Sequence, residues 1–249
     1  MDEDVRNEYK PESFGDHLFH WKRKFDNFWY HYKIALIMGI CILAFIIFVI
    51  VQCSGRIPGD ANVAYIGSGE ISAEHYNNLQ RALNEILGED LNGDGEIHVE
   101  FTYFNYMTQT QAENARAQGL PVNMQSLITV QTQIHLELAA GNIIIYFIDP
   151  NVYRELNNSG VFMPLEDSLG YLPENAHDAF TLRLGNLPAW QYYEGLNDFP
   201  SNTVVAVRNM HLEEENKKDM KERYERNLKM FKKLFDFKYL PDDLDDTEE

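Results

Sequence analysis

One long apolar run lies near the start of the chain, at residues 34–51 (IALIMGICILAFIIFVIV). Its eighteen residues carry no charge, and a helix of that length just reaches across a hydrocarbon layer of about 30 Å. A helix of this length inside a globular core would normally show a polar stripe, and this run shows none. The pattern predicts a single transmembrane helix, which we place at residues 34–52.

Basic and aromatic residues beside the apolar run predict its orientation. Arg56 alone follows the run closely, whereas four basic residues precede it: Lys22, Arg23, Lys24 and Lys33. Basic residues concentrate on the cytoplasmic side of a membrane span, so we expect a cell-membrane protein with residues 1–33 in the cytoplasm and the C-terminal domain outside. Because about 33 residues precede the run, we expect it to be retained rather than cleaved as a signal peptide.

The cytoplasmic tail carries large apolar residues at helical spacing. These residues are Leu18, Trp21, Phe25, Phe28, Trp29 and Tyr32. Their spacing predicts an amphipathic juxtamembrane helix. The alternative is an aromatic belt with no further role.

After a linker at 53–62, the pattern alternates between strand and helix. A short apolar strand at 63–66 ends in a Gly-Ser-Gly turn, and Ser72 is a suitable N-cap for a helix whose apolar residues continue to Leu87. A strand at 97–104 follows, in which apolar and polar side chains alternate. This order predicts a β-α-β unit.

The unit then extends by one helix and one strand. Residues 105–125 are polar and irregular, and we expect a loop there, with a loop that contains one turn of helix as the alternative. A helix from Leu127 to Leu138 stops at Gly141, and the run at 143–148 is continuously apolar, which is typical of a parallel strand buried on both faces. The order predicts an α/β fold with one doubly wound, mostly parallel sheet.

The C-terminal part of the domain is less regular. Residues 161–200 are rich in Pro, Gly and Asn, residues 203–207 predict one more strand, and residues 212–237 predict one long amphipathic helix that docks on the domain. Charge pairs at i,i+4, such as Glu214 with Lys218, would stabilise its solvent face by roughly a few tenths of a kcal/mol each.

Composition narrows the classes of function. The 249 residues carry a formal net charge of -18, and a nucleic-acid binder needs a basic surface, so we expect no nucleic acid as a partner. Cys41 and Cys53 both precede the extracellular domain, which we place at 63–240, so that domain has no disulfide and no thiolate site. Residues 241–249 (PDDLDDTEE) predict an acidic, disordered tail.

Residues 136–170 (LELAAGNIIIYFIDPNVYRELNNSGVFMPLEDSLG) resemble the first lobe of the extracellular solute-binding proteins of ABC importers, of the Gram-positive bacterial type. In that family a Gly-x-hydrophobic-x-Pro-Leu-x-Asp turn follows the buried strand, and here it runs from Gly160 to Asp167. The strand and helix at 63–87 and the Asp-Leu-Asn-Gly-Asp-Gly loop at 90–95 look similar too, so the resemblance covers roughly residues 63–170. A complete solute-binding protein has two lobes. About 196 residues follow the predicted anchor, and this length accommodates one lobe of usual domain size. The resemblance implies a single periplasmic-binding-protein-like lobe on a membrane anchor.

The loop of Asp90, Asn92, Asp94 and Glu96 has the spacing of the first half of a calcium loop. In such a loop, oxygens at alternate positions surround the ion, and Glu96 would offer its carbonyl. Position twelve, which should supply a bidentate carboxylate, is Phe101, so a remote carboxylate would have to complete the site. Ca²⁺ is therefore a candidate cofactor, and a helix-to-strand turn is the alternative.

Four residues follow the ends of two expected parallel strands: Gly67, Ser68, Gly69 and Asp149. Open α/β sheets bind ligands at this edge, and two backbone amides near the following helix N-terminus could hold an anion. These residues are candidate ligand-binding residues, and a tight turn with a strand-end cap is the alternative.

The sequence contains no enzyme signature of the G-x-S-x-G, P-loop, H-E-x-x-H or G-x-G-x-x-G type, and its histidines lack a metal-ligand spacing. We expect a non-enzymatic single-pass protein whose outer lobe is an accessory or interaction subunit of a transport-type membrane complex, with a multi-pass membrane protein as partner. Two alternatives stay open: a module that binds or senses a small solute, and a hydrolase with an unrecognised site.

Overall fold

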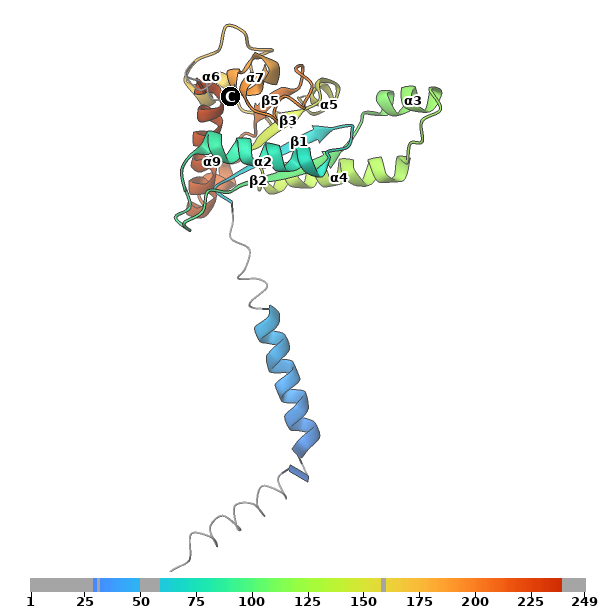
Figure 1. Ribbon diagram of the computed structural model, residues 1–249, viewed down its shortest axis with the longest axis vertical. Coiled ribbons are helices and arrows are strands. Elements are labelled where there is room, and N and C mark those ends of the chain that lie inside the picture. Colours follow the sequence, from blue (N-terminus) through green and yellow to red (C-terminus); the bar gives the residue numbers. More distant parts are fainter. Residues whose placement is uncertain (1–28, 31, 50–58, 158–159, 239–249) are drawn as a thin grey trace, which may run out of the picture. The chain divides into compact units, whose positions relative to one another are not determined.

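The structure is a computed structural model that describes residues 29–30, 32–49, 59–157 and 160–238. The chain divides into two compact units, Met1–Ile57 and Pro58–Glu249 (Figure 1). The boundary falls inside the predicted linker, while the predicted acidic tail and most of the predicted cytoplasmic segment lie outside the described residues.

Among the described residues, the first unit contains one apolar helix near the N-terminus. Its segment Tyr32–Val49 has a mean hydropathy of 2.6, and none of its residues is buried. By length and composition this helix is able to cross a membrane, and a signal sequence has the same properties. Trp29 and Tyr32 of the predicted aromatic face have helical conformation.

The second unit is built on a mixed sheet, with five strands in the order β2-β1-β3-β5-β4 in the described part of the chain. The strands are β1 (Ala61–Gly67), β2 (Val99–Asn105), β3 (Ile145–Ile148), β4 (Thr181–Arg183) and β5 (Val204–Val207). Strand β1 pairs in parallel with β2 and β3, whereas β5 pairs antiparallel with both β3 and β4. The α/β class is confirmed, and the sheet is mixed because β5 reverses direction.

The direction of each strand follows from its connection. Parallel strands of one sheet need a crossover of a dozen residues or more. Helix α2 (Ala73–Leu87) supplies it between β1 and β2, and α4 (Met124–Ala140) supplies it between β2 and β3, which lie on either side of β1. The connection from β4 to β5 holds only the short elements η2 (Leu184–Asn186) and α7 (Pro188–Tyr192). Without a long crossover helix, β5 returns beside β4 in the antiparallel sense.

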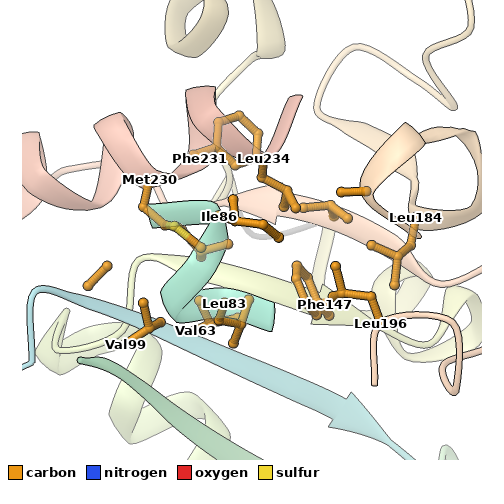
Figure 2. Close-up of a cluster of buried hydrophobic side chains, with 14 of the residues drawn as sticks. Val63, Leu83, Ile86, Val99, Phe147, Leu184, Leu196, Met230, Phe231 and Leu234 are labelled. Atoms are coloured by element: carbon orange, nitrogen blue, oxygen red, sulfur yellow. The ribbon is translucent and has the colours of Figure 1, made fainter. Parts of the chain in front are cut away.

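Apolar cores cover both faces of the sheet. Val63 and Tyr65 of β1 belong to a first core with α2 and with α9 (Lys218–Asp236). The alternate residues Ala64 and Ile66 belong to a second core with α4 and with α5 (Pro150–Leu156). Figure 2 shows the first core, where side chains of α2 and α9 meet above the sheet: Leu83, Ile86, Met230, Phe231 and Leu234. Burial on both faces explains why β3 is apolar throughout.

The predicted ends of α2 and α4 are confirmed. The Ser72 hydroxyl accepts a hydrogen bond from the His75 amide at 3.0 Å and caps α2. Gly141 ends α4 with a φ of 69°. A side chain at Gly141 would also collide with Arg208 and Glu214, so both the backbone conformation and the space require glycine.

A helix longer than the single turn that the sequence analysis allowed lies within residues 105–125. It is α3 (Gln109–Ala117), and it begins with a capping box: the Thr108 hydroxyl accepts from the Gln111 amide at 3.2 Å, and the Gln111 side chain accepts from the Thr108 amide at 2.8 Å. Among the described residues of α3, Ala112 is buried. With so small an apolar face, α3 has no hydrophobic period, and the Thr-x-x-Gln spacing was its only signal.

The helix predicted at 212–237 is divided in two. The short α8 (Leu212–Glu215) ends at Asn216, and α9 starts after Lys217. The expected pair of Glu214 with Lys218 is wrong, because the Glu214 carboxylate turns back to Arg208. Tyr224 and Phe231 of the predicted docking face are buried, as expected.

Candidate functional site

The ends of β1 and β3 bring the two parts of the predicted ligand edge together. Ile66 pairs with Ile148, and the Asp149 amide donates to the Ile66 carbonyl at 2.8 Å. Gly67 and Asp149 are therefore neighbours across the sheet, although 82 positions separate them in the sequence. Parallel neighbouring strands end at the same edge of the sheet, so the residues that follow β1 and β3 lie side by side, as predicted from the sequence.

The Asp149 carboxylate is occupied by the chain itself. Its Oδ1 atom accepts from the amides of Asn151 at 2.8 Å and Val152 at 3.4 Å, and so it caps α5. The Gln111 side chain of α3 donates to the same atom at 3.4 Å. These contacts match the strand-end cap that was the alternative for Asp149, and a ligand would have to compete with three donors.

The Gly-Ser-Gly turn is fixed by tyrosines. A side chain at Gly67 would overlap the ring and hydroxyl of Tyr65, and the Gly67 carbonyl accepts from the Tyr106 amide at 3.0 Å. The Tyr103 hydroxyl donates to the Gly69 carbonyl. Gly69 has a φ of 132°, a backbone conformation that side chains strongly disfavour. The turn thus needs glycine at both ends.

The two tyrosines of this edge stay protonated at neutral pH. Burial, the Asp149 carboxylate and Tyr103 raise the pKa of Tyr65 to about 12. Burial and the Glu70 carboxylate raise the pKa of Tyr103 to about 12. Both phenols therefore act as hydrogen-bond donors at neutral pH and do not act as bases.

Beside the turn, a hollow of about 680 Å³ opens between the start of α2 and the loop before β5. Four of its lining side chains are carboxylates, and the lining comprises Glu70, Ser72, Glu74, His75, Asn78, Glu194, Asn197 and Asp198. Four carboxylates produce a negative potential, which repels an anion and attracts a cation. The idea that the helix N-terminus holds an anion is therefore disfavoured by its surroundings.

His75 joins the two walls of the hollow. Its Nε2 atom lies 2.8 Å from the Gly195 carbonyl and 3.9 Å from Asp198 Oδ2, and its ring packs edge-on against Phe199. A side chain at Gly195 would overlap the backbone of Leu79 in α2. The contact between His75 and Gly195 could not be predicted from the sequence, because 120 positions separate the two residues and no local pattern links them.

The predicted calcium loop closes on its own backbone. The Asp90 carboxylate accepts from the amides of Gly93 at 2.6 Å and Gly95 at 2.8 Å, and these bonds lower the pKa of Asp90. The Asp94 carboxylate accepts from the Glu96 amide at 2.8 Å, while Asn92 Oδ1 accepts from the Asp94 amide at 2.9 Å. Such bonds build a turn without an ion, so they support the helix-to-strand alternative.

A buried residue outside the predicted site holds the loop in place. Asp60 is fully buried, and its carboxylate accepts from the amides of Leu91 at 2.6 Å, Asn92 at 2.8 Å and His98 at 2.9 Å. Asp60 lies in the segment that we predicted to be a linker, and no local sequence pattern marks it as a structural residue. Both of its oxygens are used by backbone amides, so this remote carboxylate supports the turn and is not positioned as an extra cation ligand.

Within the described residues, no group of three or more His, Cys, Asp or Glu side chains is placed to hold a metal ion. Ca²⁺ binding by Asp90, Asn92, Asp94 and Glu96 stays a prediction.

The chain was also compared with known proteins. No protein-family model, curated protein or solved structure matches it. The resemblance to solute-binding proteins therefore rests on sequence features within residues 63–170 and stays a prediction.

Proposed function

We propose that the chain is a non-enzymatic, single-pass membrane protein whose second unit is an accessory or interaction lobe outside the cell, beside a transport-type membrane complex. The observation that carries the proposal is the helix at 32–49, which has a mean hydropathy of 2.6 and no buried residue. A hydrocarbon layer satisfies such a surface, whereas water does not. The basic residues before the helix and the lone Arg56 after it support the orientation.

The proposed relation to one solute-binding lobe has support from the arrangement of the sheet. Strands β2, β1 and β3 are parallel, and helices cover both faces, as in a doubly wound lobe. The antiparallel β5 departs from a mostly parallel sheet. The proposed role of this lobe is contact with another protein of the membrane complex.

Membrane fractionation of the full chain tests the anchor. The chain should stay in the membrane pellet through alkaline carbonate extraction, and protease added outside intact cells should remove the second unit. Recovery of the chain in the carbonate supernatant, or protection of the second unit from external protease, would contradict the proposal. Deletion of residues 34–51 is the matched control and should release the chain.

We propose the binding of a small organic cation as a second candidate function, because the predicted ligand turn borders the acidic hollow. Glu70 and Ser72 directly follow that turn and line the hollow. The carboxylates do not converge as a metal site does, so an extended cation such as a polyamine fits them better than a metal ion. Spermidine should raise the melting temperature of the full chain.

Two variants make this test specific. Glu194→Gln removes one charge from the hollow and should lower the spermidine effect. Glu166→Gln removes one charge from α6 (Leu165–Leu169), outside the hollow, and should not change it. An equal response from the two variants would show that spermidine acts only through the overall negative charge, and the second candidate would be abandoned.

A further inference from the structure

The positive charge of the second unit is concentrated in one helix. Residues 58–249 contain fourteen Lys or Arg, and nine of these lie in residues 217–238, which comprise α9 and its two ends. The same stretch contains four Asp or Glu, so its net charge is +5. Residues 1–57 carry as many acidic as basic side chains, so the net charge of -18 lies on the second unit, and the part of it outside 217–238 carries -23. Helix α9 is therefore a basic element in an acidic unit.

One side of α9 is buried and the other carries the charges. Tyr224 and Phe231 pack in the first core. Lys221 and Lys232 are exposed. Eleven residues separate these two lysines, which corresponds to about three helical turns, so they lie on the same side of α9 and about 16 Å apart along its axis. We call this side the basic flank.

Other lysines of α9 are already paired with a carboxylate from a distant segment. Glu89, in the loop after α2, lies 2.6 Å from Lys229 Nζ and also pairs with Lys233. Hydrogen bonds from these two lysines lower the pKa of Glu89. The charged carboxylate is thus stabilised where it meets α9, although 140 positions separate it from Lys229.

The basic flank has no such carboxylate. In the part of the chain that the structure describes, neither Lys221 nor Lys232 forms an ion pair. Glu225 lies four residues after Lys221 but does not pair with it, and Glu222 pairs with Lys218 instead, at 3.6 Å. An additional acidic segment would therefore meet uncompensated positive charge at this flank.

The chain itself supplies an acidic segment of suitable charge and length. Residues 241–249 contain six Asp or Glu and no Lys or Arg, and they lie outside the described residues. Lys221 precedes Lys238 by seventeen residues, which is about 26 Å along the helix. The eleven residues that follow Lys238 span at most about 36–40 Å when extended. They are therefore long enough to return along the whole basic flank.

We propose that residues 241–249 fold back on α9 and occupy the basic flank at Lys221 and Lys232. A single exposed ion pair contributes little, so several pairs act together, and salt weakens them. The covalent connection to α9 keeps the segment at a high effective concentration, so the contact needs no large interface. An acidic partner binds the basic flank only by displacing this segment.

Carbodiimide crosslinking of the full chain in neutral detergent tests the contact. The reagent couples a carboxylate directly to an amine, so it should join residues 241–249 to Lys221 and Lys232 within one chain. Lys22 and Lys24 are the controls and should be joined to the segment only rarely. The yield should fall several-fold in about 1 M salt, where the Debye length is about 3 Å. Equal yields at the control lysines, or links that join two chains, would overturn the proposal.

Neutralising the segment should expose the two lysines. The neutral-segment variant carries Asp242→Asn, Asp243→Asn, Asp245→Asn and Asp246→Asn, and its Lys221 and Lys232 should be acetylated several-fold faster than in the unmodified chain. A matched control removes four charges from the acidic hollow and should leave these rates unchanged: Glu70→Gln, Glu74→Gln, Glu194→Gln and Asp198→Asn. Equal acceleration in both variants would show a general effect of net charge, and unchanged rates in both would show that the segment does not cover α9. Either result would overturn the proposal.

Displacement has its own test, with a labelled synthetic peptide of residues 241–249 as the probe. The peptide should bind the neutral-segment variant at least about fivefold more tightly than the unmodified chain, in which the covalently linked segment competes for the same flank. Adding Lys221→Gln and Lys232→Gln should abolish this gain, whereas adding Arg183→Gln, at an exposed residue of β4, should preserve it. Equal affinity for the unmodified chain and the neutral-segment variant would contradict the proposal. None of these measurements depends on the proposed membrane anchor.

Discussion

The Arg208 guanidinium donates two hydrogen bonds to the Glu214 carboxylate, at 2.9 and 2.7 Å, and both residues are buried. Arg208 follows β5 and also donates to the Leu138 carbonyl at 2.7 Å, in the last turn of α4. Its own carbonyl accepts from the Tyr224 hydroxyl at 2.7 Å. This pair therefore ties β5, α4, α8 and α9 together.

Removal of one member of the pair should be costly. Glu214→Ala leaves a buried guanidinium without its counter-charge and should lower the free energy of unfolding by about 3–5 kcal/mol. Denaturant unfolding of the full chain, monitored by the fluorescence of the second unit, measures this change in the free energy of unfolding. Glu222→Ala, which breaks the exposed 3.6 Å pair with Lys218, should cost at most about 1 kcal/mol. Equal costs would show that the buried pair is not special.

Acid should weaken the same contact. Burial alone would raise the pKa of Glu214, but hydrogen bonds from Arg208 and from the His211 amide hold it below its ordinary value of 4.5. A lowered folded pKa gives stability that is complete above about pH 4.5 and is lost as the pH falls below it. Glu214→Gln should therefore flatten the fall in unfolding free energy between pH 5 and 3. A slope equal to that of the unmodified chain would contradict this role.

Asp60 should matter more than its position beside the linker suggests. Asp60→Ala removes a buried acceptor from three backbone amides, and each unsatisfied buried donor costs about 1–3 kcal/mol. We expect a loss of at least about 2 kcal/mol and faster hydrogen exchange at Leu91, Asn92 and His98. Asp198→Ala on the open hollow is the control. Unchanged exchange at these amides would show that Asp60 does not hold the loop.

Removal of calcium should not unfold the second unit. The loop's own amides donate to the carboxylates of Asp90 and Asp94, and the buried Asp60 carboxylate accepts from further amides of the same loop, so the loop closes without an ion. A chelator should leave the melting temperature of the full chain unchanged, and calcium should raise it only at millimolar concentration. A large fall on chelation would show that an ion is built into the fold, and Asp90→Asn would then have to reproduce that fall.

Local signals predicted local structure. The Ser72 cap, the Gly141 helix end and the continuous apolar β3 run each have a cause within a few residues, and each was found. The proximity of Gly67 and Asp149 was also predicted, because parallel strands that end at one edge of a sheet bring the residues after them together.

The contacts that the sequence did not reveal join distant segments. His75 meets Gly195 across 120 positions, and Arg208 draws Glu214 away from the helix face that the i,i+4 spacing assigned to it. Helix α3 buries too little to produce a hydrophobic period. For His75 and Glu214, a tertiary contact outweighed the local pattern, and a single sequence carries no direct record of such contact.

The central claim is that the second unit acts as an anchored partner of a membrane complex. Crosslinking in native membranes, mild-detergent purification of the full chain and mass spectrometry of the co-purifying chains test it most directly. We expect one multi-pass membrane protein at fixed stoichiometry, and we expect it to be lost when residues 58–249 are deleted and the anchor is kept. Recovery of this chain alone, or only with further copies of itself, would contradict the accessory role.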